Sequence, residues 1–349
     1  MRAVVAGSGL MGVPLAWALH KLGLDVVIVD PDGNRLLSAG KKISSMGGKG
    51  TLLSSLEEVK DKVNVLVSAA PYHQNTKIHD WCIRNKVRYC DLGGNPATSA
   101  EIQEAARGYG LTAFTDLGLA PGFSNILAEE ICRRSPGAEG VGIRVGGLPV
   151  NPTGMLNYAR TWSTDGLRNE YSGNCETIRN GQLALVLALS EVEYLTVAES
   201  SIEMEAFHTK GGLASSLNSM IGRGVKHCDY KTIRYKGHSQ LLKFLIEDCK
   251  LTKEDFDKAI ANACPETVED EVFIVVFADD KKLKLKIMHD KNWTAMQKST
   301  AFPAASVTAL VAEGVFDDKI IPTYADIPFD RMMSNLDAIG GIPEIKLCD

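Results

Sequence analysis

The chain has 349 residues, a length that corresponds to two domains at roughly 150 residues each. Hydrophobic residues make up 45% of the chain and charged residues 23%, an ordinary globular composition that excludes a largely disordered, collagen-like or coiled-coil protein. The formal net charge of −5, from 38 Lys and Arg against 43 Asp and Glu, provides no basic stripe for a nucleic-acid backbone.

Membrane segments, export signals and disulfides are also not expected. The longest apolar runs, such as residues 183–189 and 273–278, are far shorter than the ~20 residues that span a bilayer. A strand-like run starts at Ala3 and leads directly into a glycine loop, so no signal peptide fits the N-terminus. The 8 cysteines contain no CxxC pair. We therefore expect reduced thiols, no zinc site, no membrane partner and a cytoplasmic location.

Short apolar runs alternate with helix-like segments over the first 120 residues. Such alternation indicates parallel βαβ units and hence an α/β fold with a Rossmann-type, doubly wound parallel sheet. The last helix of this part is expected to open at Thr98 or Ser99. The predicted strands are residues 2–6, 25–29, 63–69, 87–92 and 111–115, and the predicted helices are residues 13–22, 57–60, 78–86 and 99–109.

The pattern changes after Pro121-Gly122. A helix is expected at residues 124–134, and from about residue 139 longer strands follow one another with tight turns. Asn180-Gly181 is the strongest hairpin signal, and Asp279-Asp280 marks a second turn. This pattern predicts a second, α+β domain built on a mostly antiparallel sheet, followed by further helices. The predicted strands are residues 140–145, 157–162, 175–179, 183–189, 202–207, 230–235, 271–278 and 282–288, with helices at residues 239–249, 253–263, 294–313 and 330–339.

Three glycines, Gly7, Gly9 and Gly12, follow the first predicted strand and open the first predicted helix. Gly7 permits the tight turn, Gly9 lets the backbone approach a pyrophosphate, and Gly12 allows the helix to pack closely on the strand. The helix N-terminus adds free N–H groups and a positive dipole for the phosphates. The spacing alone is a weak signal, but its position between a strand and a helix predicts a dinucleotide site.

Asp30 directly follows the second predicted strand, 18 residues after Gly12. An acidic side chain there accepts hydrogen bonds from the adenine ribose and repels a 2′-phosphate, which favours NAD over NADP, although Arg35 lies close in sequence. Ligands of parallel sheets lie at the carboxyl ends of strands, so the segments after two further strands are expected to line the nicotinamide side, unless they are ordinary turns. The predicted cofactor-binding residues are Gly7, Ser8, Gly9, Leu10, Met11, Gly12, Asp30, Ala70, Pro71, Asp91 and Gly93.

Five longer sequence words lie between the glycine loop and the final helices. They are Asp116-Leu-Gly-Leu-Ala-Pro121-Gly122-Phe-Ser-Asn125, Gly146-Gly-Leu-Pro149, Glu205-Ala-Phe-His208-Thr-Lys-Gly211-Gly212, Lys231-Thr-Ile-Arg234-Tyr-Lys-Gly237-His238 and Thr300-Ala-Phe-Pro303. Their wording and order resemble the saccharopine dehydrogenase-like family and are most similar to L-lysine 6-dehydrogenases. These words are far more specific than the glycine spacing, and the resemblance covers nearly the whole chain.

The resemblance implies a Rossmann domain of residues 1–121 and 295–349, in which the C-terminal helices pack back on the nucleotide-binding half. It implies a substrate-binding and oligomerisation domain of residues 122–294. It also implies NAD-dependent oxidation of the L-lysine ε-amine to allysine, which cyclises to piperideine-6-carboxylate, with release of ammonia and NADH. Lys210 and Lys298 depart from the family pattern, so the substrate could differ. The alternative is a secondary amine, as in saccharopine- or carboxynorspermidine-type dehydrogenases with NAD(P)H.

Oxidation of an amine makes three demands on such a site. Hydride leaves the carbon readily only when the nitrogen is neutral, and a lysine amine with a pKa near ~10.4 is mostly charged at pH 7. The site must therefore offer a base or a desolvating pocket. It must also help water to attack the iminium product, and it must supply a cationic or N–H clamp for the substrate carboxylate.

Six polar residues are catalytic candidates for these tasks. Asp116, at a strand end, could hold the amine, or else act as a helix cap or hinge. His208 ends a predicted strand and could shuttle protons, or else be packed in the core. Arg234 could bind a carboxylate through two hydrogen bonds, or else lie on a solvated face. The other three candidates are His238, Tyr171 and Lys210. Their alternative explanations are a glycine turn for His238, core packing for Tyr171 and surface exposure for Lys210.

No spacing of histidines or cysteines fits a catalytic metal, and no G-x-S-x-G elbow suggests a serine hydrolase. A small-molecule amine or amino acid is the expected partner. The long strands of the second domain make a homo-oligomer a further expectation. A protein that binds NAD without turnover is the competing hypothesis from a different functional class.

Overall fold

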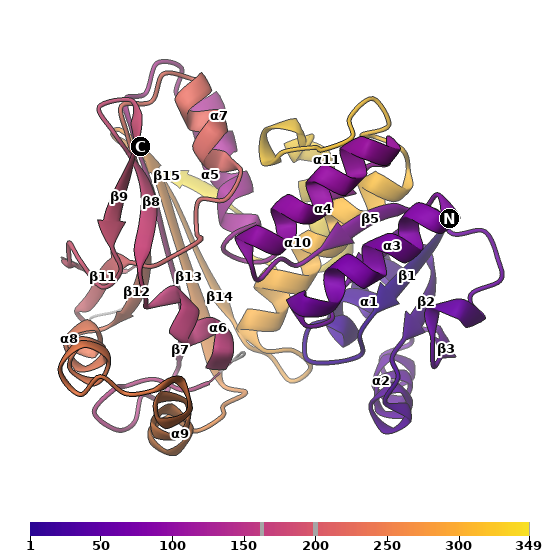
Figure 1. The fold of residues 1–349 in the computed structure, drawn as a ribbon, viewed down its shortest axis with the longest axis horizontal. Helices are drawn as coiled ribbons and strands as arrows, with labels where there is room; N and C mark the ends of the chain where they lie inside the picture. Colours follow the sequence, from indigo (N-terminus) through magenta and orange to yellow (C-terminus); the bar gives the residue numbers. More distant parts are fainter. Residues whose placement is uncertain (161–163, 198–201, 349) are drawn as a thin grey trace. The chain divides into compact units, whose positions relative to one another are not determined.

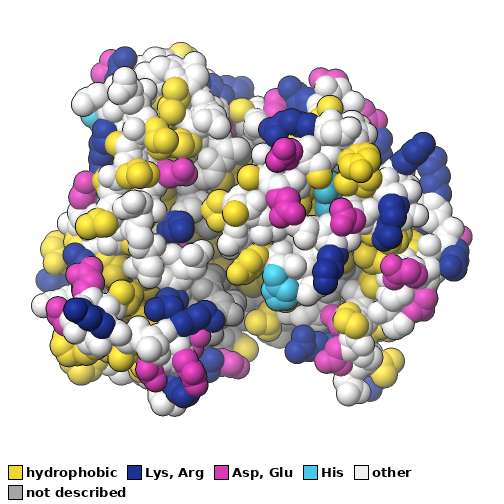
Figure 2. Space-filling view, in the orientation of Figure 1, with side chains coloured by type: hydrophobic (Ala, Val, Ile, Leu, Met, Phe, Trp, Pro, Cys, Tyr) yellow, Lys and Arg dark blue, Asp and Glu magenta, His cyan; other side chains and the backbone are white. Residues whose placement is uncertain are grey.

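The computed structural model describes residues 1–160, 164–197 and 202–348. The chain divides into two compact units. The first unit comprises Met1–Phe123 and Gln297–Ile342, and the second comprises Ser124–Met296 and Pro343–Asp349. None of the described helices is long and apolar enough to cross a bilayer. Figure 2 shows Lys and Arg side chains interspersed with Asp and Glu side chains over the visible face, so no patch of one sign covers that face.

The first unit contains a six-stranded sheet in the order β3-β2-β1-β4-β5-β6, with all neighbouring strands parallel (Figure 1). This order is that of a Rossmann fold, so the predicted doubly wound parallel sheet is confirmed. The central strands β1, β2 and β4 are nearly continuous apolar runs because both faces of a parallel sheet are buried. Their bounds are β1 (Arg2–Ala6), β2 (Asp25–Val29), β3 (Thr51–Leu53), β4 (Val65–Ser68), β5 (Arg88–Asp91) and β6 (Ala113–Phe114).

Helices complete the core of the first unit. On one face of the sheet, Val4 and Leu66 pack in a buried cluster with Ile78, Trp81 and Ile102 from two helices. The neighbouring strand residues, which point to the other face, are buried as well. The helices are α1 (Gly12–Lys21), α2 (Gly33–Ser45), α3 (Asn75–Asn85), α4 (Pro96–Tyr109), α10 (Ala295–Ala312) and α11 (Phe329–Ile339), with short 3₁₀ turns η1 (Leu56–Glu58), η2 (Tyr72–Gln74) and η4 (Tyr324–Asp326).

Two features of the first unit differ from the prediction. Helix α2 and strand β3 were not expected, because α2 is a polar helix in which only Leu36, Ala39 and Ile43 are buried. The expected start of α4 at Thr98 or Ser99 was wrong. Asn95 is the N-cap, since its side chain accepts hydrogen bonds from the next two free N–H groups of the helix, and Pro96 follows it.

The second unit contains a nine-stranded sheet. Its main path runs β10-β11-β12-β7-β13-β14-β15, and the β8–β9 hairpin joins β12 (Figure 1). All pairs are antiparallel except β12 with β7, so the predicted α+β domain with a mostly antiparallel sheet is confirmed. The strands are β7 (Gly140–Pro149), β8 (Asn174–Arg179), β9 (Gln182–Leu187), β10 (Glu193–Leu195), β11 (Met204–His208), β12 (His227–Tyr235), β13 (Asp270–Ala278), β14 (Lys281–Met288) and β15 (Lys346–Cys348).

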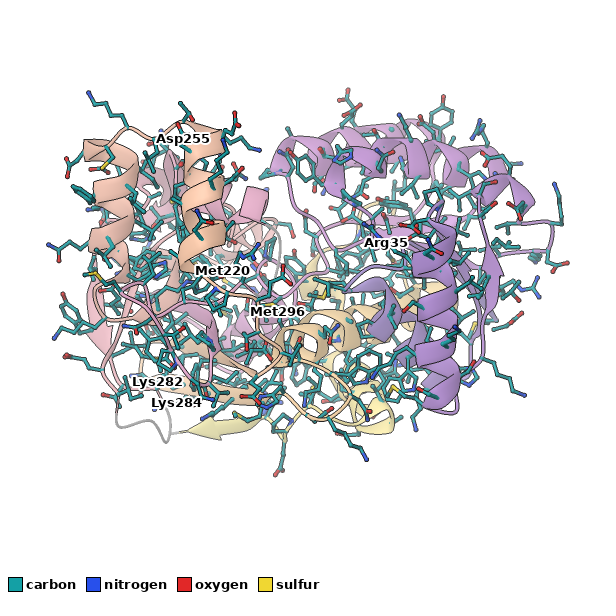
Figure 3. The ribbon with its side chains drawn as sticks, turned by 90° about the horizontal axis from the view of Figure 1, so that it is seen from below. Arg35, Met220, Asp255, Lys282, Lys284 and Met296 are labelled. Carbon is teal, nitrogen blue, oxygen red and sulfur yellow. The ribbon has the colours of Figure 1, made fainter. Side chains whose placement is uncertain are left out.

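Both predicted tight turns are present. Asn180-Gly181 joins β8 to β9, and Asp279-Asp280 joins β13 to β14. Beyond the second turn, Lys282 and Lys284 are exposed on β14 (Figure 3). The helices of this unit are α5 (Phe123–Arg133), α6 (Thr164–Glu170), α7 (Ser216–Gly222), α8 (His238–Lys243) and α9 (Lys253–Ala263), with a π-helical turn η3 (Phe244–Asp248).

Three expectations for this part were wrong. The strand expected at residues 157–162 is replaced by a single bridge between Arg160 and Glu266, and residues 161–163 lie outside the described residues. The helix expected at 239–249 changes to π-helical geometry at Phe244. Residues 343–349 were expected with the Rossmann half, but β15 pairs with β14 in the second unit, because an open strand edge can accept a distant segment that local pattern does not reveal. Helices α6 and α7 and strand β10 are too short for periodicity to indicate.

Candidate functional site

The glycine loop connects β1 to α1 through very close backbone packing. Gly7 has a φ of 105°, and a Cβ built on it would lie 2.9 Å from the carbonyl oxygen of Ala69. A Cβ on Gly12 would lie 1.9 Å from the carbonyl oxygen of Gly7. Both positions therefore require glycine, and together they bring the start of α1 directly to the carboxyl end of β1.

The same loop leaves room for a ligand at Gly9. A Cβ on Gly9 would meet no protein atom within 4 Å. Packing within the protein therefore does not explain why this position is a glycine. The N-cap of α1 is Met11, which makes no side-chain capping hydrogen bond. Uncapped N–H groups at a helix start attract phosphate, so the residues present fit a dinucleotide pyrophosphate.

Asp30 is buried beside the loop. Its Oδ2 accepts hydrogen bonds from the backbone N–H of Ser8 at 2.7 Å and from the Ser8 hydroxyl at 2.8 Å, and its Oδ1 accepts one from the N–H of Asp32 at 2.9 Å. Burial raises the pKa of Asp30, but these hydrogen bonds and the charge of Arg35 outweigh burial and lower it overall. Asp30 is therefore an anion at neutral pH, whereas Arg35 has a side chain that is 69% exposed and lies near Asp32 (Figure 3).

The other predicted cofactor residues also lie at the carboxyl edge of the sheet. Ala70 and Pro71 follow β4, and Ala69 lies against Gly7 and Gly12 of the loop. Asp91 is the last residue of β5. It is only 1% exposed, and its carboxyl group binds other groups of the protein. It accepts hydrogen bonds from the Tyr89 hydroxyl and from the N–H of Gly93.

Asp116 lies next to Asp91. The N–H of Asp116 donates to Asp91 Oδ1 at 2.9 Å, and the Ser99 hydroxyl donates to Asp116 Oδ1 at 2.9 Å. Asp116 is partly exposed and has a φ of 64°, in the left-handed region that asparagine and aspartate adopt more readily than other residues with a side chain. Burial raises the pKa of Asp116, with the Ser99 and Thr115 hydroxyls opposing the shift. This places a carboxyl group of raised pKa at the sheet edge where ligands of this fold bind.

Three predicted residues of the second unit form one buried cluster. Arg234 Nε donates to the Tyr171 hydroxyl at 3.0 Å, and this hydroxyl lies 3.1 Å from His238 Nε2. His238 Nδ1 lies 3.0 Å from the carbonyl oxygen of Leu156. Burial and the charge of Arg234 lower the pKa of His238 to about 3, so this histidine is neutral at physiological pH.

Arg234 is the charged group of this cluster. It is 4% exposed, its guanidinium stacks 4.9 Å from the centre of the Tyr158 ring, and one of its terminal nitrogens donates to the carbonyl oxygen of Ile233. Among the described residues, no carboxylate forms an ion pair with it. The charge of Glu170 acts on Arg234 without forming an ion pair with it, so this buried guanidinium is a candidate for binding an anionic group.

His208 lies on the opposite face of the sheet from Arg234. Successive residues of a strand alternate between faces, and Phe207, not His208, contacts the Tyr171 ring. His208 Nε2 lies 3.1 Å from Glu191 Oε2, and burial lowers the pKa of the imidazole although the hydrogen bond to Glu191 opposes this. The structure thus groups Arg234, Tyr171 and His238 but separates His208 from them.

Around His208 the sheet carries an ion-pair network. Arg144 pairs with Asp229 at 2.7 Å and with Glu193, and Lys231 pairs with Glu193 at 2.9 Å. Ligand atoms of Glu191, His208 and Asp229 lie within 4.8 Å of one another, but both carboxylates already bind arginine side chains. This arrangement is that of a structural charge network.

The sequence did not indicate several neighbours of the cluster. Glu205 caps the start of α8 by accepting hydrogen bonds from the N–H groups of Gly237 and Ser239, and this orients His238. In the sequence, only its position in one of the family-like segments pointed to Glu205. Burial raises the pKa of Glu170 to about 7 while the charge of Arg234 lowers it, and no spacing pattern identified it. Lys210 is exposed, and its N–H donates to the Glu170 carbonyl oxygen.

The glycine loop yields a matched pair of variants. Gly9→Ala should keep the melting temperature, because its Cβ meets no protein atom within 4 Å, but should weaken dinucleotide binding by roughly tenfold or more. Gly12→Ala should lower the melting temperature, because its Cβ would overlap Gly7. Thermal unfolding and titration with NAD and NADP measure both effects. Unchanged affinity in Gly9→Ala would contradict a pyrophosphate position at this loop.

Comparisons with known proteins agree with this architecture. The family model described as the saccharopine dehydrogenase C-terminal domain matches residues 118–341, and the one described as the saccharopine dehydrogenase NADP binding domain matches residues 3–114. Apo saccharopine dehydrogenase (L-Glu forming) from Saccharomyces cerevisiae shares the fold, with a TM-score of 0.72 at 15% identity over 100% of both chains.

Curated relatives share somewhat more sequence identity with this chain than that structure does. The mitochondrial alpha-aminoadipic semialdehyde synthase of Bos taurus is 24% identical over 291 residues, which cover 76% of this chain and 30% of that one. Saccharopine dehydrogenase [NADP(+), L-glutamate-forming] of Pyricularia oryzae is 22% identical over 276 residues, covering 72% of this chain and 58% of that one. The chain thus spans less than two thirds of the length of either relative. With both family models matched in order, the chain belongs to the saccharopine dehydrogenase family.

Proposed function

We propose that the protein is a nicotinamide-dependent dehydrogenase that oxidises a CH–NH bond of an amino acid, with L-lysine as the first candidate substrate. Oxidation of the lysine ε-amine would give allysine, which cyclises to piperideine-6-carboxylate, with release of ammonia. Family membership and the fit of the glycine loop to a dinucleotide support this proposal.

The unpaired, buried guanidinium of Arg234 is the observation that carries the choice of substrate. Three cationic residues, Arg144, Lys231 and Arg234, are described as buried in the second unit, and the first two are paired with acids. Arg234 is therefore the one of these three that is available to an anionic ligand. A substrate with a single carboxylate, such as L-lysine, requires one such clamp.

Asp116 is the proposed proton acceptor. When bound, the nicotinamide supplies hydride acceptance at the substrate carbon. Before hydride can leave, the substrate ammonium must give up a proton, and Asp116 is a partly exposed residue whose pKa is raised by burial. The products then balance as the reduced dinucleotide and an iminium, which water converts to an aldehyde and ammonia.

A secondary amine is the second candidate substrate. The relatives named above are saccharopine dehydrogenases or a semialdehyde synthase, which favours a saccharopine- or carboxynorspermidine-type reaction with NAD(P)H. Such a substrate carries more carboxylates and needs more cationic contacts than Arg234 alone. Lys210 and Lys298 are the proposed sources of additional charge.

NAD is the proposed cofactor. Asp30 is an anion held in place by Ser8, and Asp32 lies two residues further along the chain. These two carboxylates would repel a 2′-phosphate, and the exposed Arg35 is the single cation that would offset them. A homo-oligomer, a cytoplasmic location and proton transfer by His208 stay as predictions from the sequence.

The proposed function is tested by absorbance growth at 340 nm with NAD and a panel of amino acids and diamines. L-lysine should be oxidised, and turnover should rise from pH 7 to 10 because the neutral amine, with a pKa near ~10.4, becomes more abundant. Faster turnover of saccharopine, or of an aldehyde with an amine and NADPH in the reverse direction, would instead support the second candidate. Tight NAD binding without any turnover would contradict both.

Arg234→Met should raise the KM for L-lysine by roughly 10- to 100-fold, because a charge-assisted hydrogen bond of about 1.5–3 kcal/mol is lost. Oxidation of 1,5-diaminopentane, which lacks the carboxylate, should change much less. Arg179→Met serves as the control, since Arg179 pairs with Glu191 at 2.7 Å in the separate ion-pair network. Equal losses for both substrates would show that Arg234 does not bind the carboxylate.

Asp30→Asn should shift cofactor preference towards NADP. Removal of the negative charge relieves repulsion of a 2′-phosphate, so the ratio of kcat/KM for NADP over NAD should rise by about tenfold or more. Asp25→Asn, at the opposite end of β2, is the matched control and should leave the ratio unchanged. If Asp30→Asn leaves the ratio as it is in the wild type, Asp30 does not bind the adenine ribose.

A further inference from the structure

We propose that Asp91 is a positioning residue that holds Asp116 at the sheet edge and shares one proton with it, so that the pair takes the proton from the substrate amine. This inference rests on the function proposed above. It assigns Asp91 a different role from the cofactor contact expected from the sequence, because its carboxyl group is buried and engaged by protein donors.

The backbone of Asp116 is held from two sides. Asp91 Oδ1 accepts the N–H of Asp116 at 2.9 Å, and the Tyr324 hydroxyl donates to the carbonyl oxygen of Asp116 at 2.8 Å. Asp116 has a φ of 64°, in the left-handed region, which aspartate adopts more readily than most residues other than glycine and asparagine. The two hydrogen bonds, one to the N–H and one to the carbonyl oxygen, hold this conformation of Asp116 in place.

The side chain of Asp116 is fixed as well. The Ser99 hydroxyl, from α4, donates to Asp116 Oδ1 at 2.9 Å. Gly93 has a φ of 79°, and a Cβ on it would lie 2.5 Å from the same oxygen. Only glycine at residue 93 leaves space for this carboxylate. The N–H of Gly93 donates to Asp91 Oδ1, so Asp91 also fixes the loop that makes this space.

The two carboxyl groups influence each other because Asp91 is buried and Asp116, whose N–H it binds, is only partly exposed, so water screens their charges little. Burial, and next the charge of Asp116, raise the pKa of Asp91 to about 7, although three hydrogen-bond donors oppose the shift. Burial raises the pKa of Asp116 as well. Two adjacent carboxyl groups lose their protons in two steps that belong to the pair, and the second step is the difficult one.

The groups that face the pair carry no charge at neutral pH. Tyr89, from β5, and Tyr324, from η4, both have pKa values raised by burial. His79, from α3, lies with its ring 5.0 Å from that of Tyr89, and burial lowers its pKa. The hydroxyls of Ser99 and Thr115 complete the surroundings of Asp116. The second proton of the pair is therefore governed mainly by burial and by mutual repulsion.

This arrangement makes Asp116 a stronger base than a single carboxylate. Above neutral pH both groups are ionised, and one proton that moves from the substrate ammonium to the pair removes their repulsion. The pair then holds one proton and one negative charge, and the substrate amine is neutral and ready to lose hydride. A lone aspartate of ordinary pKa would accept the same proton much less readily.

Two variants shift the pair in opposite directions. Asp91→Asn keeps the shape and an acceptor oxygen but removes the repulsion, so the acidic limb of the kcat profile should move to lower pH by about one unit and kcat should fall. Tyr89→Phe removes a hydrogen bond that stabilises the ionised Asp91, so the limb should move to higher pH. A purely structural role of Asp91 would lower kcat without moving the limb, and that result would overturn the proposal.

A readout that does not need activity separates this inference from the proposed function. The pKa of Asp91 is higher in the folded protein than the usual value of an aspartate in an unfolded chain. The folded state therefore binds a proton at Asp91 more tightly than the unfolded state does. The free energy of unfolding gained in this way is lost as the pH rises towards 7. The melting temperature of the wild type should therefore exceed that of Asp91→Asn by more at pH 5 than at pH 8.

A difference in melting temperature that is constant from pH 5 to 8 would overturn the shared proton, whatever the enzyme's substrate. Conversely, a wild type that oxidises no amine with either dinucleotide but shows the pH-dependent difference would contradict the proposed function and still support an Asp91 that binds a proton in the folded protein. Glu104→Gln, which removes an exposed acid on α4, serves as the control.

Discussion

The close approach of Gly12 to Gly7 is the constraint on which the nucleotide-binding unit depends. Because a Cβ at Gly12 would overlap the Gly7 carbonyl oxygen, only glycine lets α1 begin immediately after β1. This brings the first N–H groups of α1 to the carboxyl edge of the sheet, beside Ala69 at the end of β4. Gly9 differs from Gly7 and Gly12, since no protein atom excludes a side chain there. The open space beside Gly9 is therefore the feature of this loop that indicates a ligand.

Strand alternation organises the second unit. Phe207 and His208 are adjacent in sequence but point to opposite faces of the sheet, as do Lys231 and Thr232 on the paired strand. One face carries Arg234 with Tyr171 and His238 and no acid in ion-pair distance among the described residues. The other carries His208 within a network in which acids and bases neutralise one another. The same strands thus separate a cation available to a ligand from charges that stabilise the sheet.

Buried carboxyl groups take different protonation states according to their donors and neighbours. Asp30 receives three hydrogen bonds and lies near Arg35, so its pKa falls and it remains an anion suited to recognising ribose hydroxyls. Asp91 also receives three hydrogen bonds, but deeper burial and the nearby charge of Asp116 raise its pKa to about 7. Residue type alone does not distinguish these two aspartates.

The sequence by itself determined what depends on local pattern: the alternation of strands and helices, the glycine spacing, the Asn180-Gly181 and Asp279-Asp280 turns and the words that carry the family resemblance. It did not reveal α2, because only three of its side chains are buried, nor the cap at Asn95. Only the tertiary structure joined Tyr171 to Arg234 across 63 residues and Asp116 to Asp91 across 25, and only it placed His208 on the other face. These relations depend on which strands pair and on how deeply each group is buried, and both are set by contacts between segments that no local periodicity encodes.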